Sequence, residues 1–380
     1  MTMKRPLRIL VAHNVSGKRT GGMSRIMGYV HDQVVQAGHS VDYFCAEDFP
    51  QALRGRSARF AFPMMVLQRA MAAARSGRPY DVVNVHEPSG SAIAVLKAIA
   101  GGPRVVITSY GVETRGWQRV IEEVRLGRDS VRPWSRLFFP ATIVSQSRLA
   151  LRHADHIFCS NMEDYEYLTS RYRIPARKLT RMNSGADCVY AKAACARDYS
   201  RAETLLFAGT WIKRKGICDL VPAFSELASR HPELKLVVLN GFVPEPEVRA
   251  YFPEQVRSRV LCRRAEPEKG IADAMAATDI YLLPSLFEGT PVTLIEAMFE
   301  GMPIVTTATC GMKDVIEDGR NGLLLPLRSP DAIVSAIERL LADPQLRARL
   351  GREARAEAVE KYNWQRVAEP LLQVYEQLCS

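Results

Sequence analysis

The chain has 380 residues, of which 47% are hydrophobic and 24% are charged, with a formal net charge of +10 at pH 7. These values are ordinary for a globular protein, and the length is sufficient for two domains with separate cores. They exclude a disordered chain, and no apolar run is long enough to span a bilayer. The apolar run at residues 9–12 is too short for a signal peptide, so we expect a soluble or at most peripheral protein.

The eight cysteines and seven histidines show no metal-binding spacing, because CxxC, HxxxH and HExxH patterns are all lacking. Scattered single cysteines are typical of reduced thiols in the cytoplasm. We therefore expect a cytoplasmic protein without a metal site.

Positive charge is concentrated in the first half of the chain. Residues 1–187 hold 27 Lys and Arg against 15 Asp and Glu, whereas the remainder holds 24 against 26. A basic domain favours an anionic partner, and nucleic acid, a membrane surface and phosphorylated substrates are the candidates. The signature of an RNA-binding module is lacking, so we do not expect nucleic acid as a partner.

Strand and helix patterns alternate in the first half. Strands are expected at residues 8–13, 81–85 and 105–108, and a helix at residues 23–37 follows the first of them. Such units build parallel sheets, in which ligands bind at the carboxyl ends of the strands. His86 stands at one of these ends, although a lone histidine is more often structural.

A glycine-rich loop joins the first strand to the first helix. A P-loop would need Gly where Ala12 stands and Ser or Thr where Arg19 stands, and no GxGxxG frame is present. Gly21 and Gly22 still permit close approach of the backbone to an anion at the start of the helix. A plain tight loop is the alternative interpretation.

Two segments of the first half are rich in arginine. Residues 54–78 contain six Arg and no acidic residue, and residues 115–152 contain eight Arg and three acidic residues. The second segment also carries the aromatic residues Trp117, Trp134, Phe138 and Phe139. Cationic and aromatic side chains together are typical of a surface that binds an anionic membrane or a lipid diphosphate, and a solvated helix face is the alternative.

The second half is expected to follow a loop at residues 188–203, which is rich in Ala, Arg and Cys. The segment LLFAGTWIKRKG, residues 205–216, indicates a strand that ends at a glycine loop before a helix. Another strand, at residues 234–239, ends at Asn240 and Gly241. Both loops are expected on the same ligand-binding edge of a second parallel sheet.

Residues 279–307 contain a strand, a loop, a helix and a second strand. Thr290 is placed to cap the helix, Pro291 to occupy its first position and Gly301 to end it. This arrangement again predicts a parallel sheet with a ligand at the start of the helix.

Two carboxylates lie in this unit, Glu288 in the loop and Glu296 on the second turn of the helix, with seven residues between them. The helix is apolar on most sides, so both carboxylates need hydrogen-bond donors, which a hydroxyl-rich ligand could supply. The alternative is that Glu288 is a solvated loop residue and that Glu296 pairs with a basic neighbour.

The segment EGTPVTLIEAMFEGMPIV, residues 288–305, resembles the E-x7-E region of the retaining GT-B glycosyltransferases of family 4. The resemblance implies an α/β protein with two Rossmann-like domains facing each other across a cleft. It also implies that Glu288 binds hydroxyls of the transferred sugar and that Glu296 binds the ribose of the donor nucleotide. Backbone N–H groups around Gly289 and Thr290 would face the sugar phosphate.

The resemblance includes one departure in the second half. The family has Gly-Arg where Gly209 and Thr210 stand. It also has Lys-Gly five residues after the Arg, and this sequence matches that pair, beginning at Lys215. Both cations hold the donor diphosphate in the family. The resemblance therefore implies that one phosphate ligand is missing unless Lys213 or Arg214 replaces it.

In the first half, the resemblance places Gly21 and Gly22 in a Gly-Gly loop that contacts donor phosphate or acceptor. The family commonly has His where Tyr110 stands, at the donor sugar, so the identity of the sugar stays open. The implied domains are an acceptor-binding domain at residues 1–187, a linker at 188–203 and a nucleotide-sugar-binding domain at 204–360. A C-terminal helix at 361–380 is implied to cross back to the first domain.

The expected reaction moves a hexosyl group from a UDP- or GDP-sugar to an acceptor hydroxyl with retained configuration, with the nucleotide sugar as co-substrate and no cofactor. No Asp-x-Asp occurs, so a metal clamp on the diphosphate is not expected. The expected acceptor is a lipid-linked saccharide in surface polysaccharide or lipopolysaccharide assembly, at the inner face of the cell membrane. The alternatives are a catalytically silent regulatory partner that binds nucleotide sugar and a membrane-associated binding module.

Overall fold

The computed structural model describes residues 5–19, 21–50, 58–186, 197–240, 243–264 and 269–380. The chain forms two compact units. Unit 1 comprises Met1–Asn183 and Trp364–Ser380, and unit 2 comprises Ser184–Asn363. Within the described residues, none of the helices is both long enough and apolar enough to cross a membrane.

The core of unit 1 is a parallel sheet with the strand order β2-β1-β3-β4-β5-β6 among the described residues. Its central strands consist largely of Val, Ile and Leu and are buried on both faces, as expected for a sheet covered by helices on both sides. The strands are β1 (Arg8–Ala12), β2 (Ser40–Phe44), β3 (Val82–His86), β4 (Arg104–Ser109), β5 (His156–Cys159) and β6 (Leu179–Arg181).

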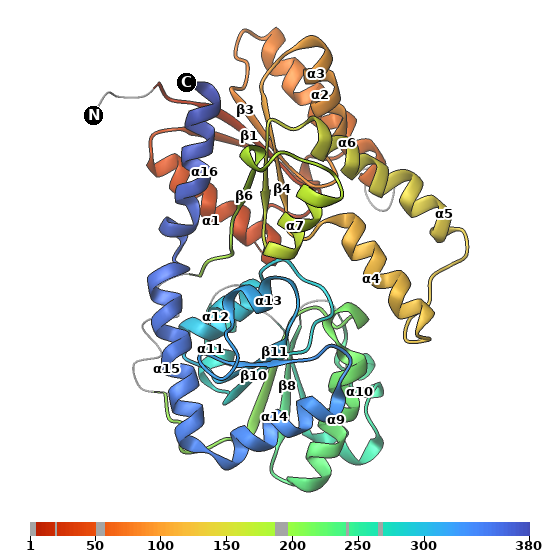
Figure 1. The fold of residues 1–380 in the computed structure, drawn as a ribbon, viewed down its shortest axis with the longest axis vertical. Coiled ribbons are helices and arrows are strands. Elements are labelled where there is room, and N and C mark those ends of the chain that lie inside the picture. Colours follow the sequence, from red (N-terminus) through yellow and green to blue (C-terminus); the bar gives the residue numbers. More distant parts are fainter. Residues whose placement is uncertain (1–4, 20, 51–57, 187–196, 241–242, 265–268) are drawn as a thin grey trace. The chain divides into compact units, whose positions relative to one another are not determined.

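Helices cover both faces of this sheet. Leu10, Val83 and Ile107 face an apolar cluster that includes residues of α2, α3 and α6, while α1 and α16 lie side by side (Figure 1). The helical elements are α1 (Gly22–Gln36), η1 (Ala46–Asp48), α2 (Ala58–Arg75), α3 (Ser91–Ala100), α4 (Glu113–Arg125), α5 (Ser135–Phe139), η3 (Pro140–Val144), α6 (Ser145–His153), α7 (Met162–Ser170), η4 (Ala176–Lys178) and α16 (Trp364–Cys379).

A buried chain of hydrogen bonds fixes α16 on the sheet of unit 1. His31 Nδ1 lies 2.7 Å from the carbonyl oxygen of Met27 and must donate to it, so His31 Nε2 accepts from the Tyr375 hydroxyl at 3.0 Å. The same hydroxyl accepts from Asn84 Nδ2 at 2.6 Å, and Thr108 donates to Asn84 Oδ1 at 2.9 Å. Helix α16 is thereby bonded directly to α1 and β3, and through Asn84 to β4.

Unit 2 contains a second parallel sheet, with the order β12-β11-β10-β7-β8-β9 among the described residues. Its apolar cluster includes buried residues of most of its strands and helices. The strands are β7 (Thr204–Ala208), β8 (Lys235–Asn240), β9 (Val260–Arg264), β10 (Ile280–Leu283), β11 (Ile304–Thr307) and β12 (Leu323–Leu325). The helical elements are η6 (Lys213–Lys215), α9 (Ile217–Arg230), α10 (Glu245–Ala250), η7 (Glu254–Arg259), α11 (Lys269–Ala276), α12 (Val292–Phe299), α13 (Cys310–Val315), α14 (Pro330–Ala342) and α15 (Pro344–Lys361).

Helix α12, between β10 and β11, begins later than the sequence pattern predicts. Pro291 precedes the helix with an extended conformation (φ −64°, ψ 126°), and no side chain caps the helix. The predictions that Thr290 is the cap and that Pro291 is the first helical residue are therefore wrong. Gly301 follows the helix with φ 64°, so the predicted end of the helix is confirmed.

Long-range hydrogen bonds explain the late start of α12. The N–H of Gly311 donates to the carbonyl oxygen of Gly289 at 2.9 Å, and the hydroxyl of Ser184 donates to the carbonyl oxygen of Thr290. These bonds hold the loop extended up to Pro291. A local capping pattern could not reveal them, because Ser184 and Thr290 are far apart in the sequence.

Part of the expected linker lies outside the described residues, namely positions 188–196, and so does Gly241. The described part of that segment is anchored in unit 2 by Arg197, whose guanidinium donates to the carbonyl oxygens of Met275, Thr278 and Glu300.

Candidate active site

Glu288 lies in the loop between β10 and α12 and contacts two cations. Its Oε1 is 2.7 Å from Lys215 Nζ, and its Oε2 is 3.4 Å from a terminal guanidinium nitrogen of Arg214. The Glu288 and Lys215 side chains are only 9% and 12% exposed, whereas that of Arg214 is 37% exposed. The interpretation of Glu288 as a solvated loop residue is therefore wrong.

The electrostatics of this cluster favour a charged carboxylate. Burial acts to raise the pKa of Glu288, but the charges of Lys215 and Arg214 outweigh it and hold that pKa below its usual value. Burial lowers the pKa of Lys215, and the adjacent Glu288 opposes this effect. The pair is thus an ion pair with a third charge, that of Arg214, beside it.

The backbone around Gly216 places these cations. Gly216 has φ 78° and precedes α9, and a Cβ atom on it would lie 1.8 Å from the carbonyl oxygen of Pro284. The N–H of Leu286 donates to the carbonyl oxygen of Arg214 at 2.8 Å, and Arg214 donates to that of Phe287 at 2.6 Å. The turn after β7 and the loop after β10 are thereby joined along their length.

Gly209 lies beside the Lys215 side chain. A Cβ atom on Gly209 would contact the Lys215 side chain at 3.4 Å. Thr210 follows at the end of β7 and is half-buried, as is Lys213 in η6. Of the two replacements considered for the missing arginine, Arg214 is the one that reaches Glu288.

Glu296 lies on α12 and is completely buried. Burial and the charges of Glu288 and Glu296 raise the pKa of the Tyr281 hydroxyl on β10, although a hydrogen bond with Thr293 Oγ1 (2.8 Å) opposes this. Both carboxylates therefore act on a single neutral phenol. Sequence reasoning missed Tyr281, because it looks like an ordinary aromatic residue of a buried strand.

In unit 1, the predicted residues His86 and Tyr110 come together. Their rings stack with centroids 5.0 Å apart, at the carboxyl ends of the paired strands β3 and β4. Burial lowers the pKa of His86 to about 3, so its imidazole is neutral. Gly21 and Gly22 lie at the start of α1, where the N–H of Gly21 donates to Ser24 Oγ at 3.2 Å.

Glu87 is a buried carboxyl that sequence reasoning did not single out. Its Oε1 accepts from the backbone N–H of Glu113, at 3.2 Å, and from the hydroxyl of Ser147. Burial, together with the charge of Glu113, raises the pKa of Glu87 to about 8. Its position directly after His86 was the only signal in the sequence.

Two family models match consecutive parts of the chain. The model described as Glycosyltransferase Family 4 matches residues 20–189, and the model described as Glycosyl transferases group 1 matches residues 202–343. The chain belongs to the family 4 glycosyltransferases.

Curated relatives agree with this assignment. The glycosyltransferase is 28% identical over 263 residues to a D-inositol 3-phosphate glycosyltransferase of Corynebacterium jeikeium, a match covering 66% of this chain and 62% of the relative. It is 26% identical over 353 residues to a phosphatidyl-myo-inositol mannosyltransferase of Mycolicibacterium smegmatis, covering 91% of this chain and 81% of the relative.

Solved structures agree on the fold. The sucrose-phosphate synthase of Thermosynechococcus elongatus has a TM-score of 0.78 with this glycosyltransferase at 20% identity, covering 98% of this chain and 99% of that one. The two Rossmann-like units are those of the GT-B fold, so the predicted family and the predicted α/β fold with two Rossmann-like domains are confirmed.

The roles of individual residues in this glycosyltransferase stay predictions. Among the described residues, no group of three His, Cys, Asp or Glu side chains is placed to hold a metal ion. Metal-independent transfer is likewise a prediction, which nucleotide titrations with and without magnesium can test.

Proposed function

We propose that this glycosyltransferase moves a hexosyl group from a nucleoside diphosphate sugar, UDP- or GDP-linked, to an acceptor hydroxyl with retained configuration. The observation that supports it is the cluster of Glu288, Lys215 and Arg214 at the carboxyl edge of the unit 2 sheet. Two cations suit a diphosphate, and a carboxylate beside them suits sugar hydroxyls.

Each residue of the site has a distinct part in the proposed reaction. Lys215 and Arg214 bind the diphosphate, Glu288 binds the sugar hydroxyls and Glu296 binds the ribose. The bond between the anomeric carbon and the phosphate oxygen breaks, and a bond to the acceptor oxygen forms on the same face of the sugar. The acceptor proton passes to the leaving phosphate oxygen, so no side-chain nucleophile is needed.

Calorimetric titration with UDP, GDP and ADP, each with and without magnesium, tests the donor site. We expect one of them to bind without magnesium at about micromolar Kd, which corresponds to about −8 kcal/mol. Lys215→Ala should weaken this binding by about 1.5–3 kcal/mol, because a charge-assisted hydrogen bond is lost. Lys235→Ala, at the exposed start of β8, is the matched control and should bind as the wild type does.

A hydrolysis assay distinguishes an active enzyme from a catalytically silent partner. Incubation of the matching nucleotide sugar should give slow hydrolysis even without an acceptor. Nucleotide binding with no hydrolysis and no transfer would favour the regulatory alternative. No nucleotide binding at all would contradict the proposed donor site.

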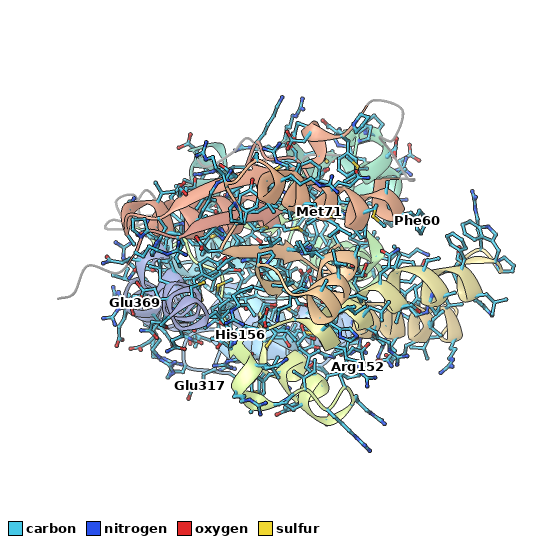
Figure 2. The ribbon with its side chains drawn as sticks, turned by 90° about the horizontal axis from the view of Figure 1, so that it is seen from above. Phe60, Met71, Arg152, His156, Glu317 and Glu369 are labelled. Atoms are coloured by element: carbon cyan, nitrogen blue, oxygen red, sulfur yellow. The ribbon has the colours of Figure 1, made fainter. Side chains whose placement is uncertain are left out.

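For the acceptor, we propose a lipid-linked saccharide at an anionic membrane. The α5 patch, formed by Phe60, Trp134, Leu137 and Phe138, supports this. Leu137 is 80% and Trp134 is 56% exposed, and the Phe138 ring lies 5.5 Å from those of both Trp134 and Phe60. Figure 2 shows Phe60 on the outside of α2.

The positive charges Arg132 and Arg136 are exposed beside the α5 patch. Clustered apolar side chains with neighbouring cations bind anionic bilayers through both burial and charge. The match to a phosphatidyl-myo-inositol mannosyltransferase, whose name describes a lipid acceptor, also supports this choice.

Sedimentation with vesicles of anionic or neutral phospholipid tests the surface. Leu137→Glu and the double variant Arg132→Ala/Arg136→Ala should each reduce binding to anionic vesicles severalfold. The control Arg152→Ala/Arg171→Ala removes two exposed arginines from α6 and the end of α7 and should bind like the wild type. Equal losses in both double variants would mean that only net charge matters, and the proposed patch would fail.

A further inference from the structure

Glu288 occupies the two cations that the proposed function assigns to the donor diphosphate. Lys215 Nζ is 2.7 Å from one carboxylate oxygen, and Arg214 is 3.4 Å from the other. The three side chains carry a surplus of a single positive charge. Only Arg214, at 37% exposed, presents much of its surface to solvent.

A diphosphate cannot share these cations with the carboxylate at low cost. A nucleoside diphosphate brings about two negative charges or more, and like charges at short range repel strongly where water is excluded. The carboxylate must therefore move away from Lys215 when the diphosphate binds. A buried carboxylate without cations or donors is itself unfavourable.

The donor and the nucleoside diphosphate product differ in whether they can stabilise the displaced carboxylate. A nucleotide sugar brings hydroxyls that can donate to the displaced carboxylate. A free nucleoside diphosphate lacks these sugar hydroxyls, and the hydroxyls of its ribose are assigned to Glu296. The carboxylate consequently opposes binding of the product more than binding of the donor.

We propose that Glu288 is an internal counter-ion, which competes with the diphosphate for Lys215 and Arg214 and which the hydroxyls of the transferred sugar hold away from these cations. This inference rests on the proposed function. Once the sugar has been transferred, Glu288 returns to the cations and displaces the nucleoside diphosphate. The residue thus selects donor over product and promotes product release, a step that limits the turnover of many enzymes.

Inorganic pyrophosphate is the probe that isolates the competition, because it has the two phosphates without sugar or base. Glu288→Gln keeps the size of the side chain and removes its charge. We expect the variant to bind pyrophosphate about tenfold more tightly than the wild type in calorimetry. The control Glu317→Gln removes an exposed carboxylate of unit 2 and should leave the affinity unchanged.

Glu288→Asp keeps the charge that the buried cations need but withdraws it by one methylene. Its affinity for pyrophosphate should lie between those of the wild type and Glu288→Gln, and it decides the matter if Glu288→Gln does not fold. Equal or weaker binding in the folded variants would overturn the inference, as would the absence of pyrophosphate binding in both the variants and the wild type.

A nucleotide series separates this inference from the proposed function. One possible result is that Glu288→Gln binds pyrophosphate more tightly while the wild type binds no nucleotide. This result would support the role of Glu288 as a counter-ion and would contradict the proposed donor site. Nucleotide binding that Glu288→Gln weakens would keep the donor site and reject the counter-ion. The inference further predicts slower release of the bound nucleoside diphosphate from Glu288→Gln in stopped-flow measurements.

Discussion

A Cβ atom on Gly216 would lie 1.8 Å from the carbonyl oxygen of Pro284. No side chain fits at this distance, and the φ of 78° at Gly216 is itself unfavourable for any residue with a Cβ. The contact presses the turn that carries Lys215 against the loop that carries Glu288. Backbone packing, and not side-chain attraction alone, therefore sets the separation of the ion pair.

Gly216→Ala should lower the free energy of unfolding by at least about 2 kcal/mol, from backbone strain and overpacking together. Urea unfolding measures this change. The control Gly319→Ala has a similar φ of 73° but nothing within 4 Å of the added Cβ, so it should cost only about 1 kcal/mol. Equal losses in the two variants would mean that the contact with Pro284 is unimportant.

Arg347 on α15 is almost completely buried and should be essential for the stability of unit 2. Its guanidinium donates to the carbonyl oxygens of Tyr199, Ser200, Leu340 and Leu341. Arg347→Ala leaves these acceptors without their donor and should cost about 3 kcal/mol or more in urea unfolding.

The control for Arg347 is Arg349→Ala on the same helix. Arg349 is exposed and donates to the carbonyl oxygen of Gly319 at 2.7 Å. Its loss should cost under about 1 kcal/mol, because water can replace the hydrogen bond. Equal effects of the two substitutions would show that burial of Arg347 contributes little.

The stability of unit 1 should fall in acid because of four histidines, namely His13, His31, His86 and His156. Burial lowers the pKa of each, to about 4 for His31 and His156 and about 3 for His86. The unfolded chain takes up protons below about pH 6.5 while the folded protein does not, so stability falls as the pH falls from about 6.5 to 4.

For the fully buried His31 and His86, the expected loss is about 1.4 kcal/mol per pH unit each, well below pH 6.5. Urea unfolding at pH 7, 6 and 5 measures the loss, and hydrogen exchange locates it in unit 1. A free energy of unfolding that is the same at pH 7 and pH 5 would contradict the prediction.

Glu87 should have the opposite effect on how stability depends on pH. Burial raises its pKa to about 8. The unfolded carboxyl ionises near pH 4.5 while the folded one keeps its proton, so the stability that Glu87 contributes is complete below pH 4.5 and is lost as the pH rises to about 8. Glu87→Gln removes this titration and should therefore improve stability relative to the wild type more at pH 8 than at pH 5. Thermal unfolding at the two pH values tests this, and an equal change at both would exclude an unusual pKa.

The parallel sheets could be predicted because their signals are local. Runs of Val, Ile and Leu end at glycine loops, and helices with clear ends follow them. Gly301 illustrates this, since a residue with positive φ after a helix is a property of a short segment. Even so, the cap of α12 was predicted wrongly, because Ser184 and Gly311, which are distant in the sequence, hold the loop residues before the helix.

Much of the candidate site depends on contacts that no local pattern contains. The sequence offered Lys213 and Arg214 equally as replacements for the missing arginine, and the contact of Arg214 with Glu288 joins two loops that are more than 70 positions apart. His31 and Tyr375, which share a buried hydrogen bond, are 344 positions apart. Such pairs follow from the path of the whole chain.

The order of the two units along the chain also has a consequence for synthesis on the ribosome. The described strands of unit 1 are translated before unit 2, but α16, which supplies Tyr375 to Asn84 and His31, is translated after it. Unit 2 is contiguous and can complete its fold while unit 1 still lacks its final helix. A stop codon shortly before Trp364 would consequently harm the unit that is made first and spare the one that is made second.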